Sequence, residues 1–445
     1  MKENDLIECV VGLCKKSVAE EWEIAIIENE KLSIEAKEGK VESFETARSL
    51  GVAVRVRIKN KPGFSYSSDI STKALKRMVE SAIAGAKAAD PQPEGGFAEK
   101  NNGTLPPAHY DKEFDSKTET EKIERALNLE NHALAYDRRV VRVRNANYAE
   151  GKRRFILTNS NSLKLDAITT GCSASLMTVA EENGQAQYGW AYGYSSNWAQ
   201  LDIEKVAREA SEDAVSMLGA HPISTTKTAV IIRNTAVCDL LGVLGNSFLG
   251  EAIAKNKSLL ADKLDKKVFS ELINIYDDHL LEGGSATFPF DGEGIPSQRT
   301  ELVRNGVLTN YLFDILWGNI AGKKSTGNAV RGGFTSPPAM GLSNLYIKEG
   351  KETLDQLVKE TGKCFLVKEL MGVHLANPVS GDFSLGASGA WIENGKIVHP
   401  VQGVTIAGNI VELFACTDGV ASDLKFTGNI GAPSIRVPCL TVSGS

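Results

Sequence analysis

Histidine, cysteine and carboxylate side chains are the groups of this chain that could bind a metal or act in catalysis. The sequence contains six histidines, at His109, His132, His221, His279, His374 and His399. No two of them are spaced i, i+4, and neither H-E-x-x-H nor H-E-x-x-x-H occurs, so the sequence shows no helical zinc motif. Asp277-Asp278-His279 could offer oxygen and nitrogen ligands, although a charged turn after a strand explains such a triplet more simply. His374 and His399 could meet across a sheet, but two ligands do not make a site.

A serine nucleophile or a phosphate-binding loop would leave its own pattern. The segment Gly386–Gly389 contains Ser388 but lacks the G-x-S-x-G spacing and has no adjacent histidine. A Ser-His-Asp set assembled only in space stays open, because such sets do not depend on sequence order. The glycine-rich segment Gly242–Gly250 matches neither G-x-x-x-x-G-K-[ST] nor G-x-G-x-x-G. We therefore assign no catalytic residue to this chain.

An aromatic group occurs in the first half of the chain. Its members are Trp190, Tyr192, Tyr194 and Trp198. They could stack on a base or another ligand, but such residues more often fill an interface or cover the face of a sheet.

Composition excludes several classes of protein. The chain has 445 residues and a net charge of -6, with no block of Lys or Arg, so we expect no nucleic-acid surface. It has no run of 18 apolar residues and no signal peptide, which predicts a cytoplasmic protein without a membrane span. The seven cysteines are widely spaced and odd in number, which favours reduced core cysteines.

The other predicted elements are arranged around a glycine-rich stretch near the C-terminus, Asn377–Asn409. Apolar runs flank Asn394-Gly395 in this stretch, which predicts a two-residue β-turn between two strands. Its other glycines are expected inside strands: Gly381, Gly386, Gly389, Gly403 and Gly408. Such a surface could accept an extended peptide as an added strand, or the glycines could only let a curved sheet bend.

The sequence of the N-terminal half predicts the same arrangement of helices and strands twice. Each copy has a helix, an antiparallel meander, a Tyr-Ser-Ser string and a second helix, and the strings begin at Tyr66 and Tyr194. The first meander is expected to comprise Glu23–Ile27, Lys31–Ala36, Ser43–Arg48 and Val52–Lys59. The second is expected to comprise Val140–Asn147, Arg154–Thr158, Leu163–Thr169, Cys172–Ala180 and Gln185–Tyr192, with turns at Glu150-Gly151 and Glu182–Gly184. A capping box is predicted at Ser116–Glu119.

These elements predict an α+β fold with four segments. We expect a first α+β unit at 1–89, a Pro- and Gly-rich linker at 90–112, a second α+β unit at 113–221, and a β-rich domain at 222–445. The C-terminal domain is expected to be built on a large antiparallel, glycine-rich sheet. It also contains an apolar helix at Val237–Phe248.

Several motifs in this order resemble the TldD/PmbA family. They are Ser380–Phe383, Gly386–Gly389, Trp391–Gly395, Pro400-Val401, Thr405–Asn409, Phe290–Pro296, Leu308–Leu312 and Lys37–Ser43. The resemblance covers nearly the whole chain. It implies a cytoplasmic protease of two related subunits that enclose a cleft, where unfolded peptides bind as extended strands. The family was earlier described as a modulator of DNA gyrase.

The resemblance also implies two kinds of subunit. TldD carries an H-E-x-x-x-H zinc motif on a helix and a further ligand near its C-terminus, whereas PmbA, also called TldE, lacks that site. Here the motif positions hold Gly242, Val243 and Ser247, and the expected cysteine falls near Asn429 or Ile430. Without imidazoles and a carboxylate these positions cannot hold zinc or activate its water. The chain is therefore expected to resemble the PmbA/TldE side, with no metal of its own and zinc on a TldD-type partner.

We expect Ser380, Gly381, Asp382 and Phe383 to line the peptide groove, because backbone pairing with a peptide needs small residues at close approach. Two other classes of function remain open. The chain could be a stand-alone peptidase with an unrecognised site, or a peptide- or protein-binding module without any link to proteolysis. The sequence also leaves open whether the chain forms a homodimer when its partner is missing.

Overall fold

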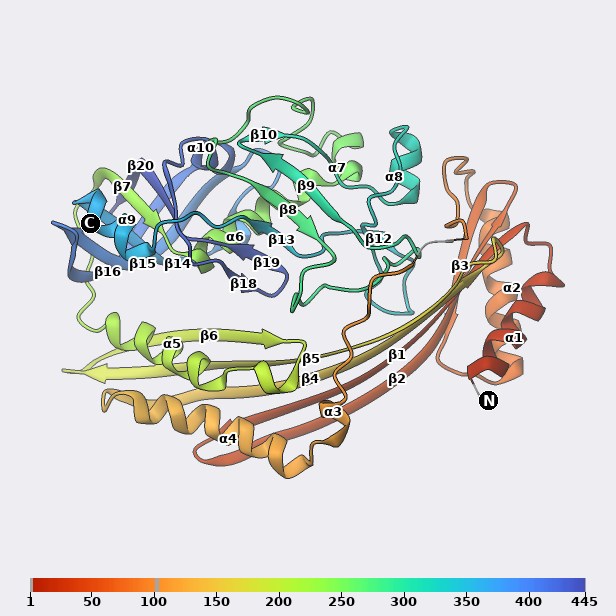
Figure 1. Ribbon diagram of the computed structural model, residues 1–445, viewed down its shortest axis with the longest axis horizontal. Helices are drawn as coiled ribbons and strands as arrows, with labels where there is room; N and C mark the ends of the chain where they lie inside the picture. The colour runs from red at the N-terminus through yellow and green to blue at the C-terminus, as the bar shows by residue number, and fades with distance from the viewer. Residues whose placement is uncertain (1–2, 101–103, 445) are drawn as a thin grey trace.

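The N-terminal half forms one twisted antiparallel sheet (Figure 1). The computed structural model describes residues 3–100 and 104–444, so residues 101–103 of the predicted linker lie outside it. In the described residues six strands are ordered β3-β2-β1-β4-β5-β6. They are β1 (Glu21–Lys37), β2 (Lys40–Ile58), β3 (Lys61–Ser67), β4 (Val140–Asn159), β5 (Lys164–Glu182) and β6 (Gln185–Ser195). Pairing of β1 with β4 joins the two predicted units into a single sheet.

The long strands of this sheet correct the predicted boundaries. The eight strands expected between Glu23 and Ala180 are four continuous ones, β1, β2, β4 and β5, of 17 to 20 residues. The turn expected at Glu150-Gly151 is wrong, because Gly151 lies inside β4 and pairs with Lys31 on one side and Gly171 on the other. The charged residues at mid-strand suggested turns, but they lie where the sheet is only partly covered by the core.

The helices repeat with the strands as predicted. They are α1 (Glu3–Lys15) and α2 (Thr72–Ala88) in the first unit, and α3 (Glu113–Ser116), α4 (Glu119–Tyr136), the short 3₁₀ turn η1 (Trp198–Gln200) and α5 (Ile203–Ser216) in the second. Ser71 caps α2. The capping box of α4 is formed by Thr118 and Glu121, two residues after the predicted one, because Ser116 still belongs to the short helix α3.

The sheet is buried on both faces around the first residues of β1, and strand alternation explains how. Ile24 and Ile26 of β1 pack in the core formed with α1 and α2. Ala25 on the other face packs in a core that includes Phe290 of the C-terminal region. Because successive side chains of a strand point to opposite faces, one apolar run serves both cores. The C-terminal domain therefore covers the face of the sheet that the helices leave free (Figure 1).

The C-terminal region contains two further six-stranded sheets that share one core with α6 (Asn234–Gly245). The first is ordered β16-β15-β14-β7-β20-β17 and comprises β7 (Thr226–Ile232), β14 (Cys364–Met371), β15 (Asp382–Glu393), β16 (Lys396–Asn409), β17 (Gly419–Val420) and β20 (Ile435–Ser443). The second is ordered β10-β9-β8-β13-β19-β18 and comprises β8 (Ile275–Asp278), β9 (Arg299–Arg304), β10 (Val307–Leu308), β13 (Leu345–Ile347), β18 (Lys425–Thr427) and β19 (Ile430–Ala432).

Smaller elements complete the domain. They are η2 (Asn246–Phe248), α7 (Gly250–Ala254), α8 (Ile315–Ile320), β11 (Ala329–Val330), β12 (Ala339–Met340), α9 (Leu354–Thr361), η3 (Val373–Leu375) and α10 (Ile410–Ala415). The α+β class is confirmed. Two pairings, β7 with β14 and β13 with β19, are parallel, so the C-terminal sheets are mixed rather than purely antiparallel.

The glycine-rich stretch forms the β15–β16 hairpin that was predicted. Asn394 and Gly395 both have positive φ at its turn. Gly389 is required by close approach, because an added Cβ would lie 1.9 Å from the carbonyl oxygen of Leu366. Gly381 differs from the prediction, since it lies in the turn before β15 with φ +80°.

The described residues include no helix that is both long and apolar enough to cross a membrane. The seven cysteines are all free, and four of them are buried: Cys14, Cys172, Cys238 and Cys364.

Candidate functional site

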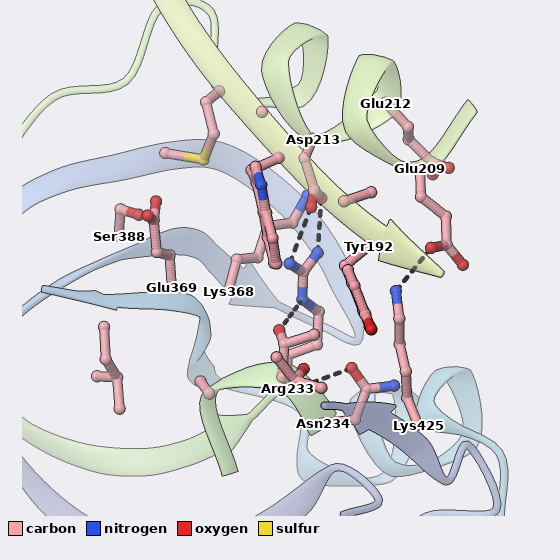
Figure 2. A pocket seen from close by; sticks show the side chains of 18 of the residues that line it. Tyr192, Glu209, Glu212, Asp213, Arg233, Asn234, Lys368, Glu369, Ser388 and Lys425 are labelled. Atoms are coloured by element: carbon pink, nitrogen blue, oxygen red, sulfur yellow. Dashed lines mark hydrogen bonds and ion pairs between the residues drawn. The ribbon is translucent and has the colours of Figure 1, made fainter. Parts of the chain in front are cut away.

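A cavity of about 460 Å³ lies where the edge strand β6 and helix α5 meet the C-terminal domain (Figure 2). Its walls come from elements far apart in sequence: β6 and α5, the start of α6, β14 and β15, and β18. No short sequence motif spans this set. The cavity therefore exists only through the packing of the second α+β unit on the C-terminal domain.

Aromatic rings form the β6 wall of the cavity. Gly189 packs so closely on α5 that an added Cβ would lie 2.0 Å from the carbonyl oxygen of Ala210. Alternation then places Tyr188, Trp190 and Tyr192 on the opposite face, where they line the cavity. Trp190 is 47% exposed, and its ring stacks on Tyr192 with centroids 6.3 Å apart and an interplanar angle of 10°. These rings offer apolar surface to a ligand.

Trp198, which the sequence placed with these aromatic residues, lies elsewhere. Its ring stacks under the guanidinium of Arg125, 3.6 Å from the ring centroid, and Lys117 approaches it at 4.2 Å. Tyr194 lines the neighbouring cavity rather than this one.

Ion pairs hold α5 to the C-terminal domain beside the cavity. Arg233, the N-cap residue of α6, donates to both carboxylate oxygens of Asp213 at 2.6 and 2.8 Å. Lys425 of β18 donates to Glu209 at 2.6 Å. Figure 2 shows both pairs reaching across the opening from α5. Since the Arg–carboxylate pair is bidentate, it fixes orientation as well as distance.

Two further carboxylates, Asp239 of α6 and Glu369 of β14, line the same cavity. Partial burial and the nearby charge of Glu369 raise the pKa of Asp239 to about 6. Burial also raises the pKa of Glu369, against the opposing charge of Arg233. Among the ion pairs of the described residues, neither carboxylate has a cationic partner within 4.0 Å. The cavity can therefore accept hydrogen-bond donors or a positive group of a ligand.

Neighbouring cavities share lining residues and follow the face of the N-terminal sheet. Tyr192 lines both the first cavity and a second one of about 380 Å³. Arg153, Thr169 and Ser285 line both the second cavity and a third one of about 300 Å³. These shared residues show that the three cavities are adjacent, and we call the three together the interdomain cleft.

The positions expected to have lost a zinc motif lie on α6 and just after it. Gly242 is exposed, and an added Cβ there would have no neighbour within 4 Å. Val243 packs against the C-terminal core. Ser247 is fully buried, and its hydroxyl accepts a hydrogen bond from the Leu259 N–H at 3.3 Å. None of these side chains offers the imidazole, thiolate or carboxylate that zinc needs, so the residues present do not fit the metal.

The position expected for a fourth ligand, near Asn429 or Ile430, lies beside α6. Helix α6 packs against β18 and β19, whose connecting turn contains Asn429. The Asn429 side chain donates to the Ser343 carbonyl oxygen at 2.7 Å. Within the described residues no group of three or more His, Cys, Asp or Glu side chains is arranged to hold a metal ion.

Two of the other histidine candidates, His279 and His399, contact neighbouring side chains. His279 is buried, which lowers its pKa to about 4, and its Nδ1 lies 3.4 Å from the Ser297 hydroxyl. Asp277 beside it accepts hydrogen bonds from Ser343 and Asn328. The His399 ring stacks on His221, with centroids 4.3 Å apart.

The four residues expected to line a peptide groove lie at the start of β15. Asn409 donates to the Ser380 carbonyl oxygen at 2.8 Å and to the Asp382 carboxylate at 2.9 Å. Gly381 is buried in this turn, and Phe383 packs in the C-terminal core. The large cavity is instead lined by Ser388 of the same strand. The groove role of Ser380–Phe383 remains a prediction. The signal that sequence reasoning missed is the alternation of small and aromatic residues along β6.

Three family models match the chain in order: PmbA/TldA metallopeptidase domain 1 at residues 22–86, the central domain at 112–218, and the C-terminal domain at 225–444. The chain belongs to the PmbA/TldD metallopeptidase family.

Both kinds of family member are similar to this chain. Metalloprotease PmbA of Escherichia coli O157:H7 is 29% identical over 425 residues, which cover 95% of this chain and 92% of that protein. A Buchnera aphidicola metalloprotease TldD homolog is 26% identical over 428 residues, covering 89% and 86%. The crystal structure of a putative modulator of DNA gyrase from Thermotoga maritima is 28% identical, with a TM-score of 0.90 over 99% of this chain and 100% of that one. TldE from Thermococcus kodakarensis has the same fold, with a TM-score of 0.91 over 99% of this chain and 100% of that one, at 21% identity.

Proposed function

We propose that this PmbA/TldD family member is the PmbA/TldE-type subunit of a two-subunit, cytoplasmic metalloprotease. In this proposal a TldD-type partner carries the zinc ion and this chain supplies part of the peptide-binding surface. One observation carries the assignment: the positions expected to hold the metal motif present Gly242, Val243 and Ser247, whose side chains cannot ligate zinc.

The state of these positions argues against a concealed metal site. Ser247 is fully buried, and its hydroxyl already accepts a hydrogen bond from the Leu259 N–H. Val243 is part of the core packing. A zinc-activated water needs ligands that fix the ion and a base that takes the proton, and this helix provides neither. The stand-alone peptidase is therefore the less favoured alternative.

The substrate we propose is an unfolded peptide bound as an extended strand in the interdomain cleft. Strand β6 is an edge of its sheet, and in the described residues only β5 pairs with it. An edge strand can accept a peptide through backbone hydrogen bonds, which are independent of the peptide's sequence. The rings of Tyr188, Trp190 and Tyr192 on the same strand would contact its apolar side chains.

Ser380–Phe383 are proposed as a second, separate peptide contact. Asp382 is exposed and pairs with Asn409 of β16, while on the β14 side the pairing of β15 ends at Met371 with Gly386. The start of β15 is thus paired with β16 and not with β14 among the described residues. Asp382→Ala and Ser380→Ala test this contact without disturbing the backbone of Gly381.

The experiment is to produce the chain alone and together with a TldD-type partner, and to measure hydrolysis of an unstructured peptide by each. We expect hydrolysis only by the complex. We also expect Trp190→Ala to raise the KM of the complex several-fold, since it removes an exposed ring from the cleft. Tyr136→Ala, which removes an exposed ring at the end of α4, is the matched control.

Three outcomes would count against the proposal. Hydrolysis by the chain alone would favour the stand-alone peptidase. Failure to associate with the partner, together with retained peptide binding, would favour a binding module without proteolysis. Equal effects of Trp190→Ala and Tyr136→Ala on the KM would show that β6 does not contact the peptide.

A further inference from the structure

The third cavity of the interdomain cleft is lined by two guanidinium groups. Arg153 comes from β4 and Arg331 follows β11. The Arg153 side chain donates to the Arg331 carbonyl oxygen at 2.7 Å. Both guanidiniums also lie within 6 Å of the Phe155 ring centroid, at 5.8 and 5.9 Å. Two like charges are thus held close together in a largely apolar setting.

Only one of the two has an acidic partner. Arg331 is 3% exposed and donates to Glu23 at 2.7 Å, and Glu23 is shared with Arg55. Among the ion pairs of the described residues, none involves Arg153. Burial and the charge of Arg331 lower the pKa of Arg153, which means that its positive charge is poorly compensated in this structure.

Hydrogen-bond donors of both groups also lack acceptors. Nε of Arg153 and Nη1 of Arg331 are buried and have no hydrogen-bond partner among the described residues. A buried donor without an acceptor is unfavourable, and a buried guanidinium more so. Arg153 is only partly buried, so a molecule in the cavity can reach its side chain.

The rest of the cavity wall fits an anionic group with an apolar neighbour. Phe155, Phe288 and Phe290 supply aromatic surface. The one carboxylate close to the arginines in this wall, Asp291, accepts hydrogen bonds from three backbone N–H groups, those of Glu293, Ile295 and Ala329. Burial and the charge of Glu293 raise the pKa of Asp291, which favours its neutral form. Its repulsion of an anion is correspondingly weak.

We propose that this cavity binds the C-terminal carboxylate of a peptide, with Arg153 as its principal partner and Arg331 supporting it. The last side chain of the peptide would lie against the phenylalanine rings. The inference rests on the proposed function, because it assumes that peptides occupy the interdomain cleft. It also gives the direction in which the peptide lies. The carboxyl end of the peptide is at Arg153, and the peptide extends past Tyr192 toward Asp239 and Glu369. Arg–carboxylate pairing is the geometry that guanidinium groups favour.

The test compares two forms of one short unstructured peptide that ends in phenylalanine, one with a free carboxylate and one with a C-terminal amide. Binding of the fluorescein-labelled peptides is measured by anisotropy, for this chain alone and for its complex with a TldD-type partner. We expect the acid to bind about tenfold more tightly than the amide, as the loss of one charge-assisted hydrogen bond predicts. Arg153→Gln should abolish that difference, and Arg153→Lys should keep part of it.

Arg154→Gln is the matched control. Arg154 is the next residue of β4, so its side chain lies on the opposite face, where it pairs with Asp166 at 2.8 Å. It should leave the preference for the acid unchanged. A peptide amide that carries an internal glutamate tests whether a side-chain carboxylate is the ligand instead. If it binds as tightly as the acid, the terminal assignment is wrong.

The outcomes separate this inference from the proposed function. Equal binding of acid and amide, in a complex that hydrolyses peptides, overturns the inference alone. A preference for the acid that survives Arg153→Gln overturns it as well. If neither form binds, both the carboxylate site and the peptide-binding role of the interdomain cleft are wrong. The subunit assignment is then still tested by association with the partner.

Discussion

Arg233 and Asp213 form a bidentate ion pair, with N–O distances of 2.6 and 2.8 Å, that joins the first residues of α6 to helix α5. Both side chains are about four-fifths buried, at 23% and 20% exposure. Both residues line the main cavity together with residues of β6. The pair therefore links the placement of the N-terminal sheet to that of the C-terminal domain.

Arg233→Ala is expected to lower the free energy of unfolding by about 1–2 kcal/mol, because it removes two charge-assisted hydrogen bonds and leaves Asp213 without its partner. Urea denaturation measures the change. Arg142→Ala is the control, since Arg142 is 63% exposed in its pair with Glu181 and should contribute no more than about 0.5 kcal/mol. Similar losses for both variants would contradict the structural role of the Arg233–Asp213 pair.

Gly242→Ala is expected to stabilise the chain by about 0.5–1 kcal/mol. Gly242 lies inside α6, it is exposed, and an added Cβ meets no atom within 4 Å, so helix propensity alone decides the effect. Thermal unfolding should show a higher Tm. A lower Tm would mean that Gly242 serves a contact that this structure lacks.

Ser247→His should have the opposite effect. Ser247 is fully buried and its hydroxyl accepts the Leu259 N–H, so an imidazole would overfill the site and orphan that donor. We expect a loss of about 1–3 kcal/mol in a urea titration. If the variant is as stable as the parent and binds zinc, the surroundings of Ser247 can still accommodate a metal ligand.

Gly381→Ala should lower stability by about 1–2 kcal/mol, because φ is +80° and the new Cβ would lie 3.1 Å from the Asn409 side chain. Gly151→Ala is the control, as an added Cβ there has no neighbour within 4 Å and φ is not positive. Guanidinium chloride titration compares the two. The sequence predicts that Gly381 lines the peptide groove. The turn geometry indicates a cost in stability too, so a binding defect in Gly381 variants needs correction for stability.

Asp239→Asn tests the electrostatics of the cavity. The pKa of Asp239 is raised from 3.8 to about 6, so between these values the folded state binds more protons than the unfolded state. Stability from this group therefore falls as pH rises through that range. We expect the Asn variant to have a higher Tm than the parent at pH 8 and the same Tm below about pH 4. A difference that is independent of pH would contradict the raised pKa.

Local features of the fold were predictable because they depend on neighbouring residues. Asn394-Gly395 forms the predicted hairpin turn, and the two N-terminal units repeat the same order of elements. Strand length was not predictable from the sequence. The charged residues around Glu150 suggest a turn, but hydrogen bonding to β1 and β5 on both sides keeps β4 continuous. Residues at mid-strand tolerate charge where no core covers them.

The candidate site was less predictable than the fold. Lys425 and Glu209 form an ion pair although they lie 216 residues apart in the sequence. No local sequence pattern predicts such a contact. The motif positions Gly242, Val243 and Ser247 could be found only through the family resemblance. The aromatic wall of β6 is visible in part, since the sequence groups Trp190 with Tyr192. The packing of the flanking Gly189 and Gly193 against a helix is not predictable from these residues alone.

The zinc content and peptidase activity of the purified chain, alone and in complex with a TldD-type partner, test the central claim most directly. We expect almost no zinc and no hydrolysis for the chain alone, and about one zinc ion per complex together with hydrolysis, since only the partner supplies ligands. Close to one zinc ion per protomer of the chain alone, with hydrolysis that a chelator abolishes, would contradict the subunit assignment and place the catalytic site in this chain.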